Sequence, residues 1–118
     1  MITLEKIKEQ LEPLYIKYDN IKIGIAGSYA NGTQHENSDI DIVLEGDSTR
    51  QDIAEYIKSL FDIEVDVLWL DLMLEEDKEM DKFLLSIGLD KNEESIYKTV
   101  MREVIWIWQN HIARIYNY

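Results

Sequence analysis

The stretch from residue 38 to residue 44, SDIDIVL, constrains the fold of this chain more than any other feature. Successive side chains of a β-strand point to opposite faces, so Asp39 and Asp41 would share one face of a strand. Ile40 and Ile42 would share the other face with the leucine that ends the stretch. The stretch therefore predicts a strand that packs one apolar face into a core and holds two carboxylates on its second face.

Two carboxylates held one pleat apart repel each other, and each raises the pKa of the other unless a cation lies between them. Mg²⁺ prefers oxygen ligands and usually combines one or two carboxylates with the phosphates of a substrate. The pair formed by Asp39 and Asp41 therefore predicts a magnesium site that a phosphorylated substrate completes.

A second motif lies upstream of this pair. Residues 21–26, IKIGIA, alternate well enough to form a strand, which leads directly into Gly27 and Ser28. Glycine lets the backbone approach a ligand closely, and the free N–H groups of a short helix after the strand would point at an anion. The Ser28 hydroxyl adds one more donor. Together with the carboxylates, this turn predicts a site for a nucleoside triphosphate.

Gly27-Ser28, a gap of ten residues and Asp39-x-Asp41 resemble the signature of the DNA polymerase beta-type nucleotidyltransferase superfamily, in particular its minimal branch, the MNT proteins. The resemblance implies an α/β fold with a small mixed β-sheet flanked by helices. It also implies that the two aspartates hold two Mg²⁺ ions together with a third carboxylate from a later strand. Residues 63–69, IEVDVLW, supply that strand. Asp66 is the better match for the third ligand, and Glu64 remains the alternative.

The same resemblance implies how ATP is bound as the substrate. Gly27 and Ser28 would hold the triphosphate, and Tyr29 and Ser38 would be further nucleotide-binding residues. A cap for Asp39, or a group that orients its carboxylate, is another role predicted for the Ser38 hydroxyl.

Many minimal nucleotidyltransferases carry a basic residue where this chain has Asn31. Lys22 and Arg50, the first lysine or arginine before and after Asn31, could replace that charge. His35 lies in the loop between the two motifs, where we expect a solvated side chain rather than a base or a metal ligand.

The activity that the resemblance implies is transfer of AMP from ATP onto a hydroxyl, with release of pyrophosphate. MNT proteins are often antitoxins paired with a HEPN-type toxin, which suggests a tyrosine of such a partner as the acceptor. One alternative is a non-catalytic module that neutralises a partner by stoichiometric contact. Another is an aminoglycoside-type nucleotidyltransferase that modifies a small molecule, although the helical domain that would hold the drug is missing.

Composition narrows the class of partner. The 118 residues suit a single domain, 1–118, and carry 24 acidic and 12 basic side chains, for a net charge of −12. Nucleic-acid binding depends on Lys and Arg that neutralise phosphates, so a nucleic-acid partner is disfavoured.

The chain has no cysteine and therefore no disulfide or thiolate site. It shows neither a signal-like start nor an apolar run long enough for a bilayer, which predicts a cytoplasmic protein without membrane contact.

Helical spacing predicts the remaining elements. Apolar residues recur from Leu4 onwards after Thr3, a suitable N-cap, and Pro13 should bend or end this first helix. Ser48-Thr49-Arg50-Gln51 has the form of a capping box before a second helix. The apolar stripe expected on that helix consists of Ile53, Ile57, Leu60 and Phe61. Met80, Phe83, Leu84 and Ile87 mark a third helix that stops at Gly88.

The last part of the chain predicts an apolar helix from about residue 99 to residue 116. Its stripe consists of Met101, Val104, Ile105, Trp108, Ile112 and Ile115, and Trp106 and Ile107 widen it. Such a helix would pack over the sheet or form an interface with a partner or a second copy of the chain. We expect His111 to be structural there. The acidic run 75–81 should form a solvated helix face or a docking surface for a basic partner.

Overall fold

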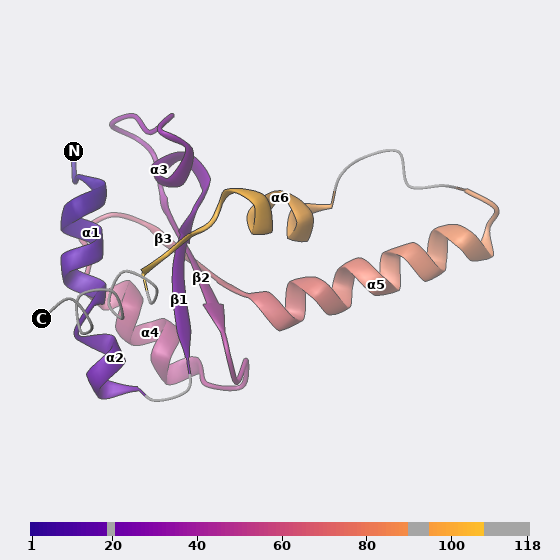
Figure 1. Cartoon of the computed structure of the whole chain (residues 1–118), viewed down its shortest axis with the longest axis horizontal. Coiled ribbons are helices and arrows are strands. Elements are labelled where there is room, and N and C mark those ends of the chain that lie inside the picture. The colour runs from indigo at the N-terminus through magenta and orange to yellow at the C-terminus, as the bar shows by residue number, and fades with distance from the viewer. Residues whose placement is uncertain (19–20, 90–94, 108–118) are drawn as a thin grey trace, which may run out of the picture.

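The computed structural model describes residues 1–18, 21–89 and 95–107, which form a four-stranded sheet flanked by helices (Figure 1). In chain order the elements are α1 (Leu4–Leu11), α2 (Leu14–Lys17), β1 (Lys22–Ala26), α3 (Gly27–Asn31), β2 (Ile40–Glu45), α4 (Gln51–Ser59), β3 (Val65–Trp69), α5 (Leu70–Ser86), α6 (Ile96–Glu103) and β4 (Ile105–Trp106). The predicted α/β class with a small mixed sheet is confirmed. No helix of the described residues is long and apolar enough to cross a membrane.

The strands lie in the order β3-β2-β1-β4. β1 pairs with β2 in antiparallel register, so that Ala26 lies opposite Asp41. β2 and β3 run parallel, joined through α4, and this register sets Asp41 beside Asp66. β4 completes the sheet as an antiparallel neighbour of β1. Residues opposite each other on paired strands share a face, so both carboxylates lie on the same face of the sheet.

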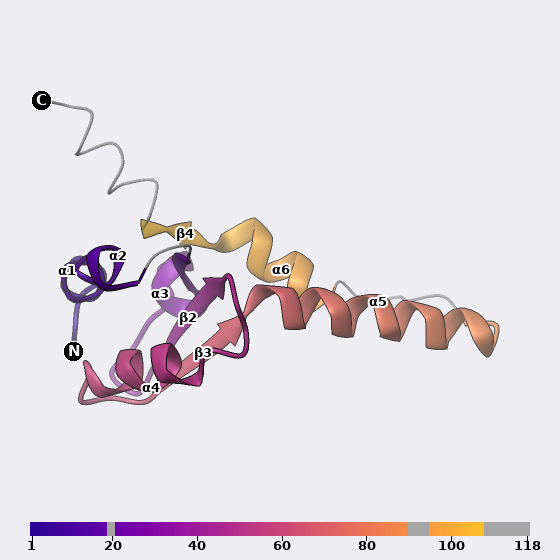
Figure 2. The same ribbon diagram turned by 90° about the horizontal axis from the view of Figure 1, so that it is seen from below.

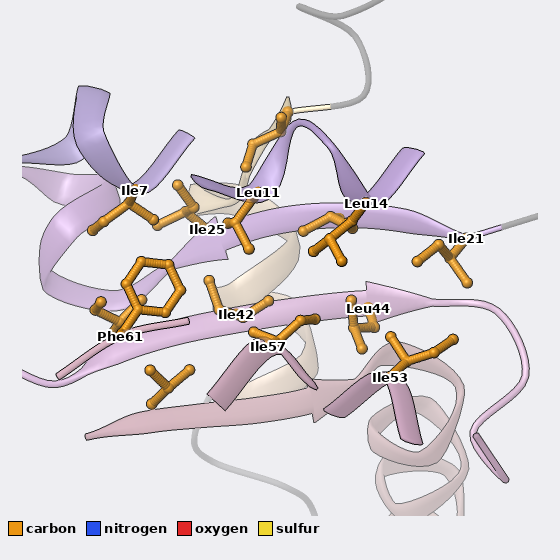
Figure 3. Packing of buried hydrophobic residues seen from close by; sticks show 14 of the residues in the cluster. Ile7, Leu11, Leu14, Ile21, Ile25, Ile42, Leu44, Ile53, Ile57 and Phe61 are labelled. Atoms are coloured by element: carbon orange, nitrogen blue, oxygen red, sulfur yellow. The ribbon is translucent and has the colours of Figure 1, made fainter. Parts of the chain in front are cut away.

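The helices α1, α2 and α4 cover one face of the sheet, which we call the closed face (Figure 3). Side chains from these helices meet those of β1 and β2 there, and many are fully buried. The largest of them include Ile7, Leu11, Leu14, Ile25, Ile42, Ile53 and Ile57. Thr3 caps α1 as predicted, since its hydroxyl oxygen accepts a hydrogen bond from the Lys6 N–H at 3.2 Å.

The opposite face, which we call the open face, is only partly covered. Ala26, Val43 and Leu70 form a small buried cluster there beneath the first turn of α5 and beneath α6. Gly24 makes this cover possible, because a Cβ at that position would come within 3.0 Å of Trp106 Cε3. Asp41 and Asp66 lie on the same face nearer the start of their strands. The cover therefore ends where the carboxylates begin.

The capping box predicted before α4 is wrong. Arg50 occupies the N-cap position and makes no side-chain capping bond. Asp47 orders the turn instead, because its Oδ1 accepts hydrogen bonds from the Thr49 N–H at 3.0 Å and from the Thr49 hydroxyl at 2.6 Å. An aspartate that closes a turn two residues ahead competes with a capping arrangement at the serine and threonine. Ile53 and Ile57 are confirmed as the buried stripe of α4, whereas the helix ends at Ser59, before the predicted members Leu60 and Phe61.

The helix predicted from about 99 to 116 is wrong in its described part. The helix α6 ends at Glu103, and the chain then becomes extended and forms β4. The wide apolar surface is divided between the two faces, because Trp106 of β4 packs on the open face while Ile107, which follows β4, is buried in the closed-face core. Trp108, His111, Ile112 and Ile115 lie outside the described residues.

The helix α5 begins directly after β3 and extends beyond the sheet (Figure 2). It starts earlier than the predicted third helix, and it stops at glycine as expected. Gly88 has a φ of 76°, and the N–H groups of Gly88 and Leu89 donate to the carbonyls of Leu85 and Leu84 at 3.1 and 2.9 Å. This is a left-handed helix stop that glycine adopts without strain.

Candidate active site

The centre of the candidate site is the pair Asp41 and Asp66, which lie side by side on the parallel strands β2 and β3. Asp41 is half-buried, whereas Asp66 and Asp39 are exposed. Asp39 immediately precedes β2 and joins the others from the same side of the strand. The register therefore brings together Asp41 and Asp66, which are far apart in sequence, and Asp39 lies near enough for its charge to act on Asp41.

The carboxylates of this cluster repel one another, and the repulsion acts on the pKa of Asp41. Partial burial raises the pKa of Asp41, and the negative charges of Asp66 and Asp39 raise it further. A hydrogen bond between the carboxyl groups of Asp41 and Asp66 acts in the same direction. Full ionisation of the cluster at neutral pH therefore calls for a compensating cation.

Gly27 stands against this cluster. Its φ is 67°, a left-handed conformation that side chains other than glycine rarely adopt. A Cβ at Gly27 would overlap Oδ2 of Asp41. The sequence predicted a close approach of this glycine to a ligand, and the structure adds that it packs directly against a predicted metal ligand.

The short helix α3 follows at once and begins with Gly27 and Ser28. The first N–H groups of a helix have no acceptor within it, so those of Gly27, Ser28 and Tyr29 are free of intrahelical bonds. The Tyr29 side chain is 2% exposed and belongs to the closed-face core. Its ring therefore anchors α3, and only the backbone of Tyr29 is left to meet a nucleotide.

Loop residues before β2 shape the approach to Asp39. The Ser38 hydroxyl oxygen accepts a hydrogen bond from the His35 N–H at 2.8 Å, and the Ser38 N–H donates to the His35 carbonyl at 2.9 Å. Nδ1 of His35 accepts from the Asn37 N–H at 3.2 Å. Ser38 thus ties the loop that ends at Asp39, and nucleotide contact by Ser38 stays a prediction. His35 is exposed, as expected.

Asn31 has a local role that sequence reasoning missed. Its Oδ1 accepts hydrogen bonds from the Thr33 N–H at 3.1 Å and from the Thr33 hydroxyl at 2.6 Å, which closes the turn after α3. The signal was present in the sequence, since asparagine followed two residues later by threonine is typical of such turns.

Neither basic residue considered as a replacement for the charge lies beside Gly27. Lys22 stands at the other end of β1 and pairs with Glu45 at 3.8 Å. Arg50 precedes α4 and pairs with Asp52 at 2.8 Å. Neither Lys22 nor Arg50 therefore supplies a positive charge beside Gly27.

The donor set suits a hard cation whose coordination is completed by a ligand. Within residues 1–18, 21–89 and 95–107, no three carboxylate or imidazole side chains are grouped so as to hold a metal ion by themselves. Mg²⁺ usually takes one or two carboxylates and fills its other positions with water and substrate phosphates. Asp41 and Asp66 offer oxygen ligands whose mutual repulsion a divalent cation would relieve.

Comparison with known proteins agrees with this geometry. A model of the nucleotidyltransferase domain family matches residues 4–107. The chain belongs to this family. The Methanocaldococcus jannaschii protein MJ1215 is 38% identical over 77 residues, 58% of this chain and 90% of that protein. The nucleotidyltransferase relative "Protein adenylyltransferase MntA" of Thermococcus cleftensis is 28% identical over 116 residues, 91% of this chain and 98% of that protein.

Solved structures share the nucleotidyltransferase fold. A toxin–antitoxin complex with AMP-PNP superimposes with a TM-score of 0.55 at 22% identity, over 90% of this chain and 78% of that chain. A mutant MntA–HpeT toxin–antitoxin complex gives a TM-score of 0.52 at 20% identity, over 95% of this chain and 80% of that chain. The arrangement of sheet and helices is therefore that of nucleotidyltransferases found in such complexes.

Proposed function

We propose that this nucleotidyltransferase is a protein adenylyltransferase that moves AMP from ATP onto a hydroxyl of a partner toxin and so acts as an antitoxin. The observation that carries the proposal is the close approach of Gly27 to the carboxylate of Asp41, which lies beside Asp66 on the open face. This close approach sets a turn with free N–H donors, suited to phosphate, beside oxygen ligands suited to Mg²⁺.

Each part of the site has a task in the reaction. Asp39, Asp41 and Asp66 would hold two Mg²⁺ ions, which neutralise the triphosphate and favour the ionised form of the attacking hydroxyl. The N–H groups at the start of α3 and the Ser28 hydroxyl would bind the β- and γ-phosphates. The acceptor oxygen bonds to the α-phosphorus, the bond from that phosphorus to the β-phosphate bridging oxygen breaks, and pyrophosphate leaves. The proton of the acceptor passes to the Asp66 carboxylate.

The acceptor that we propose is a tyrosine hydroxyl of a HEPN-type toxin. The relative from Thermococcus cleftensis is named a protein adenylyltransferase, and the similar solved structures are toxin–antitoxin complexes. An acceptor held by another protein also suits the site, because Asp66 and Asp39 are exposed on an open face rather than enclosed in a pocket for a small molecule. A large acceptor can approach such a face directly.

The test is transfer of label from ATP labelled at the α-phosphate, in the presence of Mg²⁺, to a purified HEPN-type toxin added as the candidate acceptor. We expect label on the partner, released as AMP-tyrosine after proteolysis and located by mass spectrometry. Label on another residue would correct the acceptor. Absence of label on a partner that binds tightly would instead favour a non-catalytic antitoxin.

Two acidic variants from the same strand region identify the third carboxylate. Asp66→Asn should abolish labelling, because Asp66 pairs with Asp41 across the sheet. Glu64→Gln should leave labelling within about twofold, since Glu64 is exposed ahead of β3 and contributes only its backbone carbonyl, which accepts from the Ile40 N–H at 3.0 Å. The reverse result would move the third ligand to Glu64.

A further inference from the structure

The far half of α5 leaves the body of the molecule. Its first residue, Leu70, is buried against the open face, and the helix then continues past the sheet for most of its 17 residues (Figures 1 and 2). This arm gives the chain its long dimension of 54 Å, against 33 and 29 Å in the other two directions. Packing against the sheet therefore does not account for apolar side chains on the far part of this helix.

One side of this arm is apolar. At 3.6 residues per turn, five apolar residues fall within an arc of about 100°. They are Met73, Met80, Phe83, Leu84 and Ile87. The first of them packs against the open-face cluster beneath α6. The other four form what we call the distal stripe, in which Met80, Phe83 and Ile87 are 49%, 57% and 53% exposed.

The spacing of the stripe is that of a helix–helix contact. Met73, Met80 and Ile87 are seven residues apart, and Phe83 lies between the last two, as in the seam of a coiled coil. The molecule already uses the first position of this seam, since Tyr97 and Val100 of α6 join Met73 against the same cluster. The distal stripe therefore continues an existing helix contact beyond the end of its cover.

Charge along the arm is segregated. α5 carries six acidic residues and two lysines, which gives the helix a net charge of −4. By helical spacing, Glu79 borders one side of the stripe and Asp77 and Asp81 border the other, while Glu76 lies in line with the stripe about one turn before Met80. Both lysines, at positions 78 and 82, fall roughly on the opposite face of the helix. The apolar stripe is therefore framed by carboxylates.

We propose that the distal stripe docks a helical segment of a partner protein that carries apolar side chains at heptad spacing flanked by Lys or Arg. Such a segment would bury Met80, Phe83 and Ile87 and set its cations against the acidic borders. A second copy of this chain is the poorer occupant, because two acidic borders would then face each other. The surface is separate from the carboxylates at the start of β2 and β3, and the docking does not depend on nucleotidyl transfer.

The probe is a synthetic helical peptide with leucine at the heptad contact positions and lysine at the flanking positions, and its matched control has glutamate at those flanks. Binding to the full chain is measured by fluorescence anisotropy. We expect the lysine peptide to bind and the glutamate peptide not to bind. Phe83→Gln should weaken binding about tenfold, as for a buried aromatic anchor. Leu85→Gln should change nothing, because Leu85 is 72% exposed on the other side of the helix.

Three outcomes would overturn the proposal. One is equal loss of affinity in Phe83→Gln and Leu85→Gln, and another is equal binding of the two peptides. The third is a wild-type dimer in sedimentation equilibrium that Phe83→Gln dissociates, which would make a second copy the occupant. If circular dichroism shows that Phe83→Gln loses helix, the double change Glu76→Gln with Glu79→Gln replaces it, with Glu75→Gln as its control. Only the double change should weaken binding of the lysine peptide.

Discussion

The two faces of the sheet divide the work of this protein between them. On the closed face, α1, α2 and α4 exclude water from a continuous core, and side chains such as Ile42 are fully buried. On the open face, α6 and the start of α5 cover only a small cluster, and the carboxylates of Asp41 and Asp66 remain partly in solvent. Burial on the closed face therefore supplies most of the stability of the fold, and the open face can carry charged side chains without disturbing that core.

The division runs along a single strand. Asp41 and Ile42 are neighbours in β2, yet strand alternation sends one side chain to each face. A change of one residue in register would therefore bury the carboxylates and expose the isoleucines. Stability and chemistry can be separated experimentally by substitutions at adjacent positions.

The largest expected effect is on the closed face. Ile42→Ala should lower the free energy of unfolding by about 2 to 5 kcal/mol, because it leaves a cavity in a fully buried site. Ile63→Ala is the matched control, since Ile63 is 39% exposed before β3 and should cost about 1 kcal/mol or less. Urea denaturation followed by circular dichroism measures both. Similar losses for the two variants would show that the closed face is not the main source of stability.

The open face should behave in the opposite way. Asp41→Asn should lower AMP transfer about a hundredfold or more, because the site loses a central charged oxygen ligand, while the free energy of unfolding should not fall. Glu45→Gln, at the exposed end of the same strand, should keep both transfer and stability within about twofold and 0.5 kcal/mol. A marked loss of stability in Asp41→Asn would mean that the open face also supports the fold.

Gly27 packs against the site and also has a strained backbone conformation, and Gly32 at the other end of α3 is its matched control. Gly27 and Gly32 have φ values of 67° and 82°, so alanine at either should cost about 1 to 2 kcal/mol from backbone strain. Only at Gly27 does the added Cβ overlap Asp41, since no atom lies within 4 Å of a Cβ at Gly32. Gly27→Ala should therefore abolish AMP transfer, whereas the folded fraction of Gly32→Ala should remain active. If the two variants transferred AMP equally well, the close approach of Gly27 to Asp41 would not matter for the reaction.

Alternation in the sequence predicted most of the open face. The pattern around Asp39 and Asp41 defined the strand and its two faces, and the register then placed Asp66 beside Asp41. Residue spacing also predicted α1, with Thr3 as its cap, and the glycine stop of α5. These features depend on local geometry, which neighbouring residues determine.

Features that depend on distant contacts were predicted less well. The segment around Trp106 has apolar residues at helical spacing, yet it pairs with β1 because the sheet offers an open edge there. Asp47 replaced the expected capping box because a turn before α4 uses its carboxylate. The burial of Tyr29 follows from packing against the closed-face core, which a motif does not reveal. Tertiary contacts decided each of these cases.

The smallest expected effect is on how the free energy of unfolding depends on pH. It concerns the charge of an open-face carboxylate and leaves the closed-face core unchanged. Because the pKa of Asp41 is raised in the folded protein, ionised Asp41 costs stability. Its favourable contribution is present below the unfolded pKa and is lost as pH rises through the raised pKa of the folded protein. In EDTA, Asp41→Asn should therefore match wild type in acid and exceed it at neutral pH, on the order of 0.5 kcal/mol after solvent screening.

Asp52 supplies the control of opposite sign. The hydrogen bond from Arg50 holds the pKa of Asp52 below its usual range, so its contribution is present at neutral pH and is lost as pH falls. Asp52→Asn should thus be less stable than wild type at pH 7 and match it in acid, as followed by thermal unfolding. If both substitutions shifted stability in the same direction with pH, the carboxylates of the open face would not be held against their mutual repulsion. The need for a cation at Asp41 would then lose its physical basis.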